Sequence, residues 1–152
     1  MVVEKSLNLY IYLKKQMKDK ERAILNKLNN FFLTDALVED EYEYNRFDAA
    51  NTSYIVEIKY RDKFYEDTII EFDKFSYNLL YSKMANKDFI YAVKMLKKIY
   101  VFNITKLVKK GTAFNWTWKE LVKQTEFADK RKIKKLVGYI NINESVKEIY
   151  AK

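Results

Sequence analysis

The segment NRFDAANTSYIVEIKYRD, residues 45–62, contains three side chains that together could support metal-assisted hydrolysis. Asp48 and Glu57 supply carboxylates, and Lys59 supplies an ammonium group two positions after Glu57. Carboxylate oxygens are ligands that Mg²⁺ prefers, and this ion needs few of them because it keeps several water molecules. A neighbouring ammonium could orient an attacking water or neutralise the charge growing on a scissile phosphate. This chemistry requires the three side chains to lie on one face of the fold.

A β-hairpin would bring them to one face. Residues 41–50 and 54–62 are rich in strand-forming side chains with a period of two, and the dipeptide Thr52-Ser53 lies between them. A two-residue turn there fixes the pairing of the strands. Counting outward from the turn pairs Asn51 with Tyr54, Asp48 with Glu57, and Arg46 with Lys59. The opposite face of the hairpin then carries the apolar side chains Phe47, Ala49, Val56 and Ile58.

Two carboxylates directly opposite each other on neighbouring strands repel, which a sequence selected only for stability would tend to avoid. A divalent cation between Asp48 and Glu57 would reverse the sign of that interaction. The simpler alternative is a solvated strand face with cross-strand ion pairs to Lys59. The triplet Glu57-Ile58-Lys59 is the only one in the chain in which an acidic residue stands two positions before a lysine.

The composition excludes several classes of enzyme. The 152 residues include no Cys and no His, so a cysteine nucleophile, a thiolate zinc site and a histidine-based triad are excluded. Hydrolysis would have to use Asp, Glu, Lys and Tyr with a hard cation such as Mg²⁺ or Mn²⁺. The net charge of +8 makes a polyanion a plausible partner.

The surrounding pattern predicts one α/β domain over 1–152, with a mixed central sheet flanked by helices in the order helix, three strands, helix, two strands. The chain has two Gly and no Pro, and it contains no obvious linker. The expected elements are a long or broken helix from Ser6 to Phe32 that carries Glu21, strands near 41–50, 54–62 and 66–72, a helix capped by Asp73, and strands in 89–96 and 98–107 joined tightly at Lys97-Lys98. A C-terminal extension over about 105–152 is expected to end in a helix from Ser145.

The arrangement of Asp48 nine residues before Glu57-Ile58-Lys59, on a hairpin that follows a helix bearing Glu21, resembles the PD-(D/E)XK nuclease superfamily. The resemblance covers about 6–104 and is greatest to small Holliday-junction resolvases of phages and archaea. Phe47 stands where the Pro of the family motif would be. The resemblance implies a restriction-endonuclease-like fold and Mg²⁺- or Mn²⁺-dependent hydrolysis of DNA phosphodiester bonds, often by a homodimer. It also implies that Asp48, Glu57 and the Ile58 carbonyl are metal ligands, that Lys59 is the catalytic lysine, and that Glu21 is an auxiliary carboxylate of the metal site.

Basic residues around the motif are candidates for contacts with phosphates, which position a nucleic acid without reading its sequence. The candidates are Arg46, Arg61 and Lys63 beside the proposed site, and Lys130, Arg131 and Lys132 in the C-terminal run KRKIKK. Phe114, Trp116 and Trp118 are interpreted as core or dimer interface in preference to a base-stacking platform.

Two other functions remain open at this point. One is a nucleic-acid-binding protein that keeps the fold without catalysis, and the other is a phage-type protein that binds a protein partner through its aromatic C-terminal region. No apolar run reaches the length needed to span a membrane, so we expect a cytoplasmic protein of a bacterial, archaeal or phage-infected cell, with no membrane partner.

Overall fold

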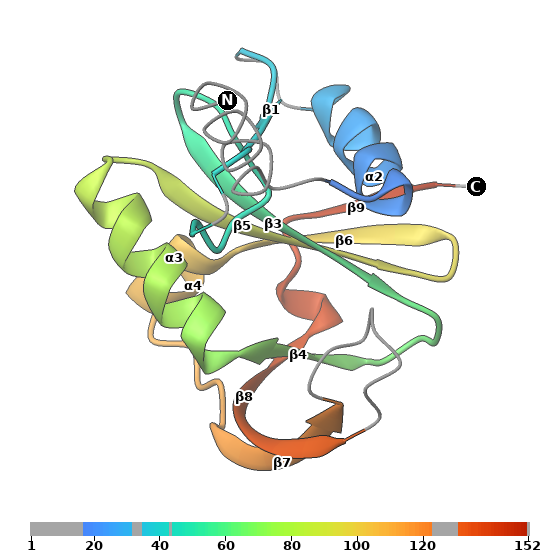
Figure 1. Ribbon diagram of the computed structural model, residues 1–152, viewed down its shortest axis with the longest axis vertical. Coiled ribbons are helices and arrows are strands. Elements are labelled where there is room, and N and C mark those ends of the chain that lie inside the picture. The colour runs from blue at the N-terminus through green and yellow to red at the C-terminus, as the bar shows by residue number, and fades with distance from the viewer. Residues whose placement is uncertain (1–16, 32–34, 43, 123–130, 152) are drawn as a thin grey trace, which may run out of the picture.

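The computed structural model describes residues 17–31, 35–42, 44–122 and 131–151. These residues form two β-sheets and the helices that pack against them (Figure 1). The main sheet has six strands in the order β1-β2-β3-β5-β6-β9. Its strands are β1 (Val38–Glu39), β2 (Ala49–Ala50), β3 (Tyr54–Arg61), β5 (Asp88–Met95), β6 (Lys98–Asn103) and β9 (Lys147–Tyr150). The second sheet, in the order β4-β8-β7, consists of β4 (Asp67–Glu71), β8 (Lys132–Asn141) and β7 (Thr117–Val122).

In the part of the chain that the structure describes, the helices are α2 (Asp19–Asn29), α3 (Phe72–Met84) and α4 (Ile104–Lys109), with a 3₁₀ turn at Ile142–Glu144. Strands β3 and β5 are parallel, and the chain passes between them through β4 and α3. The other strand pairs of the main sheet are antiparallel, so the sheet is mixed. The predicted α/β class, a mixed sheet flanked by helices, is confirmed. None of the described helices is both long and apolar enough to cross a membrane.

The main sheet separates two hydrophobic cores. On one face, α2 buries Ile24, Leu25 and Leu28 against apolar side chains of β3, β5 and β6. On the other face, side chains of β3, β5 and β6 pack with Phe75 of α3, with α4 and with Ile140 of β8. Because β3 and β5 are covered on both faces, nearly every residue of β5 is buried, as expected for the centre of a sheet between two layers.

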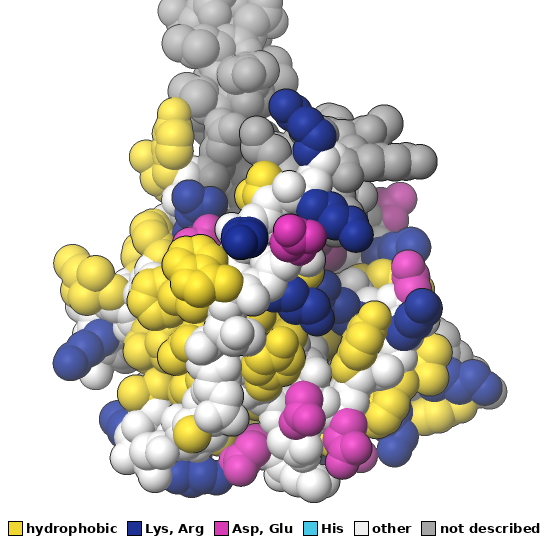
Figure 2. Space-filling view, turned by 90° about the horizontal axis from the view of Figure 1, so that it is seen from below, with side chains coloured by type: hydrophobic (Ala, Val, Ile, Leu, Met, Phe, Trp, Pro, Cys, Tyr) yellow, Lys and Arg dark blue, Asp and Glu magenta, His cyan; other side chains and the backbone are white. Residues whose placement is uncertain are grey.

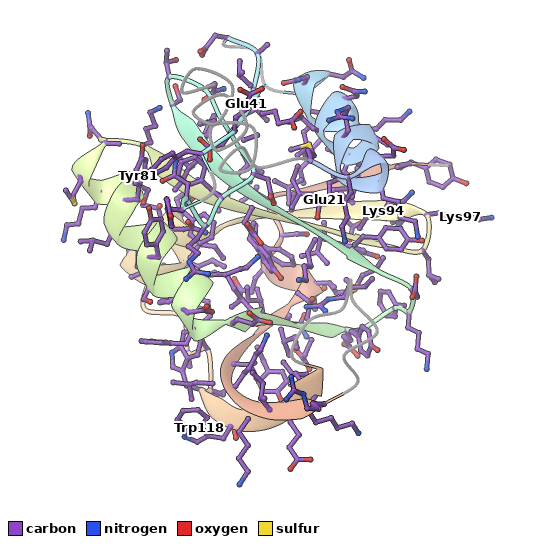
Figure 3. The ribbon with its side chains drawn as sticks, viewed as in Figure 1. Glu21, Glu41, Tyr81, Lys94, Lys97 and Trp118 are labelled. Carbon is purple, nitrogen blue, oxygen red and sulfur yellow. The ribbon has the colours of Figure 1, made fainter. Side chains whose placement is uncertain are left out.

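The second sheet lies on the α3 side of the molecule (Figure 1). Figure 2 views the protein from that side and shows hydrophobic and basic side chains interleaved on the surface. Trp118, Ile133 and Phe72 are among the exposed large hydrophobic residues. In contrast, Phe114 is buried and Trp116 packs against Phe75 with 4.8 Å between ring centroids. Of the three aromatic residues predicted as core or dimer interface, Phe114 and Trp116 belong to the core. Trp118 is exposed and projects away from β7 (Figure 3), where the dimer interface stays a prediction.

Several expected elements differ from the observed ones in their extent. The helix expected from Ser6 to Phe32 is seen as α2, Asp19–Asn29, and 1–16 lie outside the described residues. The strand expected over 41–50 is wrong for most of its length, because only Ala49–Ala50 pair as β2. Asn45 and Arg46 lie in a loop instead, and the Arg46 carbonyl accepts a hydrogen bond of 3.2 Å from the side chain of Asn78 on α3.

The strands expected at 54–62 and 66–72 are observed as β3 and β4, although β4 belongs to the second sheet. The helix expected at Asp73 is observed as α3, but Glu71 holds the N-cap position without a side-chain cap and Asp73 lies in the first turn. The tight connection between β5 and β6 falls at Leu96-Lys97, one residue before the expected dipeptide.

The expectations for the last part of the chain are corrected by the structure. The strand expected over 98–107 ends at Asn103, whose side chain caps α4 by accepting a hydrogen bond from the Lys106 amide (3.0 Å). The final helix expected from Ser145 is wrong, because Lys147–Tyr150 form β9 at the edge of β6. Ile149 is buried opposite Ile99, so long-range pairing and burial override the local preference of this segment.

Candidate active site

Asp48 lies immediately before β2, where the pairing with β3 becomes irregular. Ala49 lies opposite Val56, and the amide of Asp48 also donates a hydrogen bond of 2.8 Å to the Val56 carbonyl. Two consecutive residues therefore face one residue of the partner strand, which is the arrangement of a β-bulge. The predicted register is confirmed from Asn51 to Ala49, but Asp48 is displaced from its expected place directly opposite Glu57.

The bulge also changes the face on which the preceding residue lies. Phe47 was expected to share a face with Val56 and Ile58, which pack on the α2 side. It packs instead with Ile55 and Phe89 in the core on the α3 side. The correction has a simple cause, since one extra residue in a strand reverses the alternation of side chains beyond it.

The Asp48 carboxylate reaches the backbone of β3. The Ile58 amide donates a buried hydrogen bond of 2.7 Å to Oδ2 of Asp48. Within the described residues, β2 pairs with β3 only at Ile55 and Val56, so the edge of β3 beyond Val56 is open to Asp48. The N–H and C=O of one strand residue point to the same edge. The carbonyl of Ile58 therefore faces the edge where the Asp48 carboxylate lies.

Glu57 projects from β3 to the α3 side and is almost completely buried, with 1% of its surface exposed. Its Oε1 forms an ion pair with the ammonium of Lys74 on α3. Its Oε2 is buried and has no hydrogen-bond partner among the described residues. Burial and the nearby Asp48 carboxylate raise the pKa of Glu57 to about 8, although the ammonium groups of Lys74 and Lys59 act in the opposite direction. A buried carboxylate oxygen without a partner is uncommon and is a candidate for binding an ion.

Lys59 projects to the same side of β3 as Glu57 and is partly buried. Burial lowers the pKa of Lys59, and the positive charges of Lys74 and Arg61 lower it further. Glu57 and Glu71 partly compensate, which places both carboxylates in the electrostatic surroundings of the ammonium. The side chains of Asp48, Glu57 and Lys59, predicted from their spacing, therefore belong to one charged cluster.

The second sheet meets this cluster at its α3 side. Glu71 at the end of β4 pairs with Lys135 of β8, with 3.1 Å between Oε1 and Nζ. The hydrogen bond and charge of Lys135 outweigh the effect of burial, so the pKa of Glu71 is lowered. Tyr91 of β5 donates a hydrogen bond of 3.0 Å to the Ile69 carbonyl of β4, and burial raises the pKa of this phenol to about 12. These contacts attach β4 and β8 to the sheet that carries Glu57.

A pocket of about 460 Å³ extends from Lys59 along the end of β3 toward the start of α2. It is lined by Lys18, Lys20, Glu21, Lys59, Tyr60, Arg61, Asp62, Lys63 and Tyr65. Five of these side chains are basic and two are acidic. The ammonium of Lys20 lies 4.4 Å from the centre of the Tyr60 ring, which holds the lysine against the pocket wall. The pocket therefore offers a basic surface next to the catalytic candidates, a chemistry suited to phosphate groups.

Glu21, the expected auxiliary carboxylate, lines this pocket from α2 (Figure 3). No group of three or more acidic side chains that could hold a metal occurs in the described part of the chain. In this structure Glu21 therefore does not join Asp48 and Glu57 in one ligand set.

The predicted phosphate contacts are divided between two regions. Arg61 and Lys63 line the pocket beside Lys59, as expected from their sequence positions. Arg46 is exposed in the loop before β2 and so does not pair with Lys59 across two strands, which corrects the expected register at that point. Arg131 and Lys132 are exposed at the start of β8 in the second sheet, and Lys130 lies outside the described residues.

Sequence reasoning missed Lys74, whose ammonium forms an ion pair with Glu57. Lys74 is the third residue of α3, and its ammonium lies near both Glu57 and Asp48. A lysine in the first turn of a helix is unfavourable for the helix dipole, since that end carries partial positive charge. This unfavourable position in the first helical turn was the only feature of the sequence that could have marked Lys74 as functional. It does not indicate which carboxylate the lysine pairs with.

The oxygen atoms at this site fit a small divalent cation. Asp48 and Glu57 contribute carboxylates, and Oε2 of Glu57 has no hydrogen-bond partner among the described residues. The Ile58 carbonyl faces the edge of β3 where the Asp48 carboxylate lies. Two carboxylates with one carbonyl and water molecules match the donor set of Mg²⁺ or Mn²⁺ better than that of zinc. The mutual repulsion of the carboxylates, expressed in the raised pKa of Glu57, would be relieved by such an ion.

A scan against models of known protein families gives no match to this chain. A search of curated protein sequences gives none either.

Proposed function

We propose that this protein is a nuclease of restriction-endonuclease-like fold that hydrolyses DNA phosphodiester bonds with Mg²⁺ or Mn²⁺. The observation that carries the proposal is the buried Glu57 carboxylate, with one oxygen lacking a hydrogen-bond partner, next to Asp48 and on the same strand as Lys59. Buried charged groups are costly to a fold and are concentrated at functional sites. A solvated strand face, the simpler alternative, does not account for this degree of burial.

The order of elements supports the proposed fold. Along the chain, α2 is followed by β1, β2, β3 and β4, then by α3, and then by β5 and β6. The three strands predicted before the second helix correspond to β2, β3 and β4. The third of them pairs in the second sheet, so the sequence order agrees with the resemblance but the placement of β4 does not.

Each residue of the site has a role in the proposed reaction. Asp48, Glu57 and the Ile58 carbonyl would hold the divalent cation. The bound cation would supply a more acidic water molecule and polarise a phosphate oxygen. Lys59 places its ammonium next to the scissile phosphate, where it stabilises the negative charge of the transition state. Glu21, on the pocket wall, remains a proposed auxiliary carboxylate.

The basic pocket beside Lys59 is the proposed path of the DNA backbone. Arg61 and Lys63 come from the end of β3, while Lys18 and Lys20 approach from the start of α2. Contacts of this type supply affinity without sequence specificity. Arg131 and Lys132 would extend the contact if the duplex also reaches the second sheet.

The test combines a cleavage assay with a binding assay. Purified protein is incubated with supercoiled, linear and four-way-junction DNA in Mg²⁺, Mn²⁺ or EDTA. We expect cleavage that requires the divalent ion, and we expect Lys59→Ala to lower its rate by about 10²–10³-fold with little change in DNA affinity. Lys97→Ala, in the exposed turn between β5 and β6, is the matched control and should cleave like the wild-type protein.

A protein that binds nucleic acid without cleaving it is the second candidate. The ion pair between Glu57 and Lys74 favours it, because the lysine neutralises the carboxylate without a metal ion. Absence of cleavage with every ion and DNA form, together with equal losses of DNA affinity in Lys59→Ala and Glu57→Ala, would establish this alternative.

Branched DNA as the substrate and a homodimer as the active form are further parts of the proposal, and both come from the resemblance. Exposed apolar side chains on α3, including Leu80 at 61% and Met84 at 81% exposure, provide a surface on which a second copy could pack. Light scattering at micromolar concentration with and without DNA tests the dimer, which is refuted if the mass of one chain is found in both conditions.

A further inference from the structure

Lys74 occupies an unusual position for a lysine at a proposed metal site. It projects from the first turn of α3, and its ammonium pairs with Oε1 of Glu57. The negative charge of Asp48 also acts on this ammonium. The Glu57 side chain is 2% exposed and that of Lys74 is 30% exposed. Solvent therefore reaches the lysine of this ion pair but not the carboxylate. A monovalent cation of the protein itself thus lies against the carboxylates that would hold the divalent ion.

The charges of the cluster already balance without a metal ion. Above about pH 8, where Glu57 is ionised, the carboxylates of Asp48 and Glu57 are matched by the ammonium groups of Lys59 and Lys74. Glu57 interacts electrostatically with the other three groups, and Lys74 also interacts with Asp48 and Lys59. A divalent cation added to this set would bring two surplus positive charges into a poorly solvated region, where like charges repel strongly. Binding of the ion is therefore favourable only if an ammonium leaves or if further negative charge arrives.

Of the two lysines, Lys74 is the one able to leave. About a third of its side chain is exposed, and it is anchored by a flexible four-carbon stem at the end of a helix. Lys59 projects from the central part of the cluster on β3, and it lies among Glu57, Glu71 and Arg61. An outward rotation of the Lys74 side chain would free Oε1 of Glu57 while the strand that carries Lys59 stays in place.

We propose that Lys74 is a resident counter-ion that a divalent cation must displace from Glu57, so that it lowers the affinity of the metal site when DNA is absent. The proposal rests on the proposed function, since it concerns the same site. It adds a mechanism of regulation to that site. The phosphates of the substrate supply the negative charge that accommodates the displaced ammonium, so DNA and the divalent ion bind cooperatively. Lys74 then restricts metal loading, and hence hydrolysis, to the DNA-bound protein.

The experiment measures Mg²⁺ binding to the full chain by titration calorimetry at pH 8.5 without DNA. Lys74→Met and Lys74→Gln remove the competing charge, and Lys83→Met removes an exposed lysine from the last turn of the same helix. We expect both Lys74 variants to bind Mg²⁺ at least about tenfold more tightly than the wild-type protein, because unit charges about 4 Å apart interact by several times the thermal energy at a protein surface. Lys83→Met should bind like the wild type.

Thermal unfolding provides a second measurement for variants of reduced stability. Removing Lys74 leaves Glu57 without its partner, so the unfolding temperature should fall in the absence of metal and should rise more with Mg²⁺ than that of the wild-type protein. Equal Mg²⁺ affinities in the wild-type protein and both Lys74 variants, with equal increases in unfolding temperature, would overturn the counter-ion role.

Glu57→Gln distinguishes this failure from failure of the proposed function. If Glu57→Gln abolishes Mg²⁺ binding but the Lys74 variants bind no more tightly than the wild type, the metal site stands and the counter-ion role is wrong. If Mg²⁺ binding is absent from all variants, or is unchanged in Glu57→Gln, both the metal site and the counter-ion role are wrong.

Discussion

Replacing Glu57 with glutamine should change how the stability of the metal-free protein depends on pH. In the folded protein the pKa of Glu57 is raised from 4.5 to about 8 by burial and by the Asp48 carboxylate. In the unfolded chain the carboxyl group is in water and has an ordinary pKa. Between these two values the folded protein holds a proton that the unfolded chain has released. Stability from this group is therefore present at low pH and is lost as the pH rises from about 5 to 8.

The size of the effect follows from the shift. Each pH unit between the two pKa values changes the free energy of unfolding by about 1.4 kcal/mol, so the group removes about 4 kcal/mol between pH 5 and 8 as an order of magnitude. Glutamine has a similar shape and does not titrate. As the pH rises from about 5 to 8, the unfolding free energy of the wild-type protein should therefore fall relative to that of Glu57→Gln. The difference between the two proteins should become constant above about pH 8.

Urea denaturation of both proteins in a chelating buffer, at intervals of half a pH unit from 4.5 to 9, measures this difference directly. Glu66→Gln, in the exposed turn before β4, is the matched control and should track the wild-type protein across the whole range. The reasoning is refuted if the difference between Glu57→Gln and the wild type is constant from pH 5 to 8. In that case the Glu57 carboxylate is no harder to ionise in the folded protein than in water.

Other predictions follow from the pocket and from the second sheet. Arg61→Gln and Lys63→Gln should each weaken DNA binding, and each should reduce the slope of log affinity against log salt by about one for a lost phosphate contact; an unchanged slope in a salt titration contradicts that role. Gly138→Ala should destabilise the protein by about 1–3 kcal/mol in urea, because a Cβ atom there would lie 2.9 Å from the Trp116 ring, and a stability equal to the wild type would show that the ring moves freely. Asn103→Ala should lower the unfolding free energy by about 1 kcal/mol through loss of the α4 cap, and an unchanged chemical denaturation curve argues against a stabilising cap.

The parts of the fold that sequence patterns predicted are those with strong local signals. Strands β3, β5 and β6 consist of β-branched and aromatic residues in short runs, and α3 follows a helical pattern, so their existence and type were predictable. Glu57 and Lys59 were placed on one face by the period of a strand alone. The short turn at Thr52-Ser53 fixed the register of the hairpin as far as Ala49.

Other features depend on partners that are distant in the sequence. The segment from Lys147 to Tyr150 forms β9 because it pairs with the edge of β6. Strand β4 belongs to the second sheet because it pairs with β8 and not with β3. A local pattern contains no information about which distant backbone will supply hydrogen bonds. The same limit applies to the bulge at Asp48, which depends on how two strands meet.

The composition and spacing of the sequence by themselves determined which chemistry is possible: carboxylates and amines without His or Cys, with Asp48, Glu57 and Lys59 close enough to act together. Only the tertiary structure decided how those groups are used. Burial of Glu57 raises its pKa, and α3 brings Lys74 to its carboxylate across 17 residues of sequence. Desolvation and charge pairing are properties of the packed protein, because they depend on every element that surrounds a side chain and not on its neighbours in the chain.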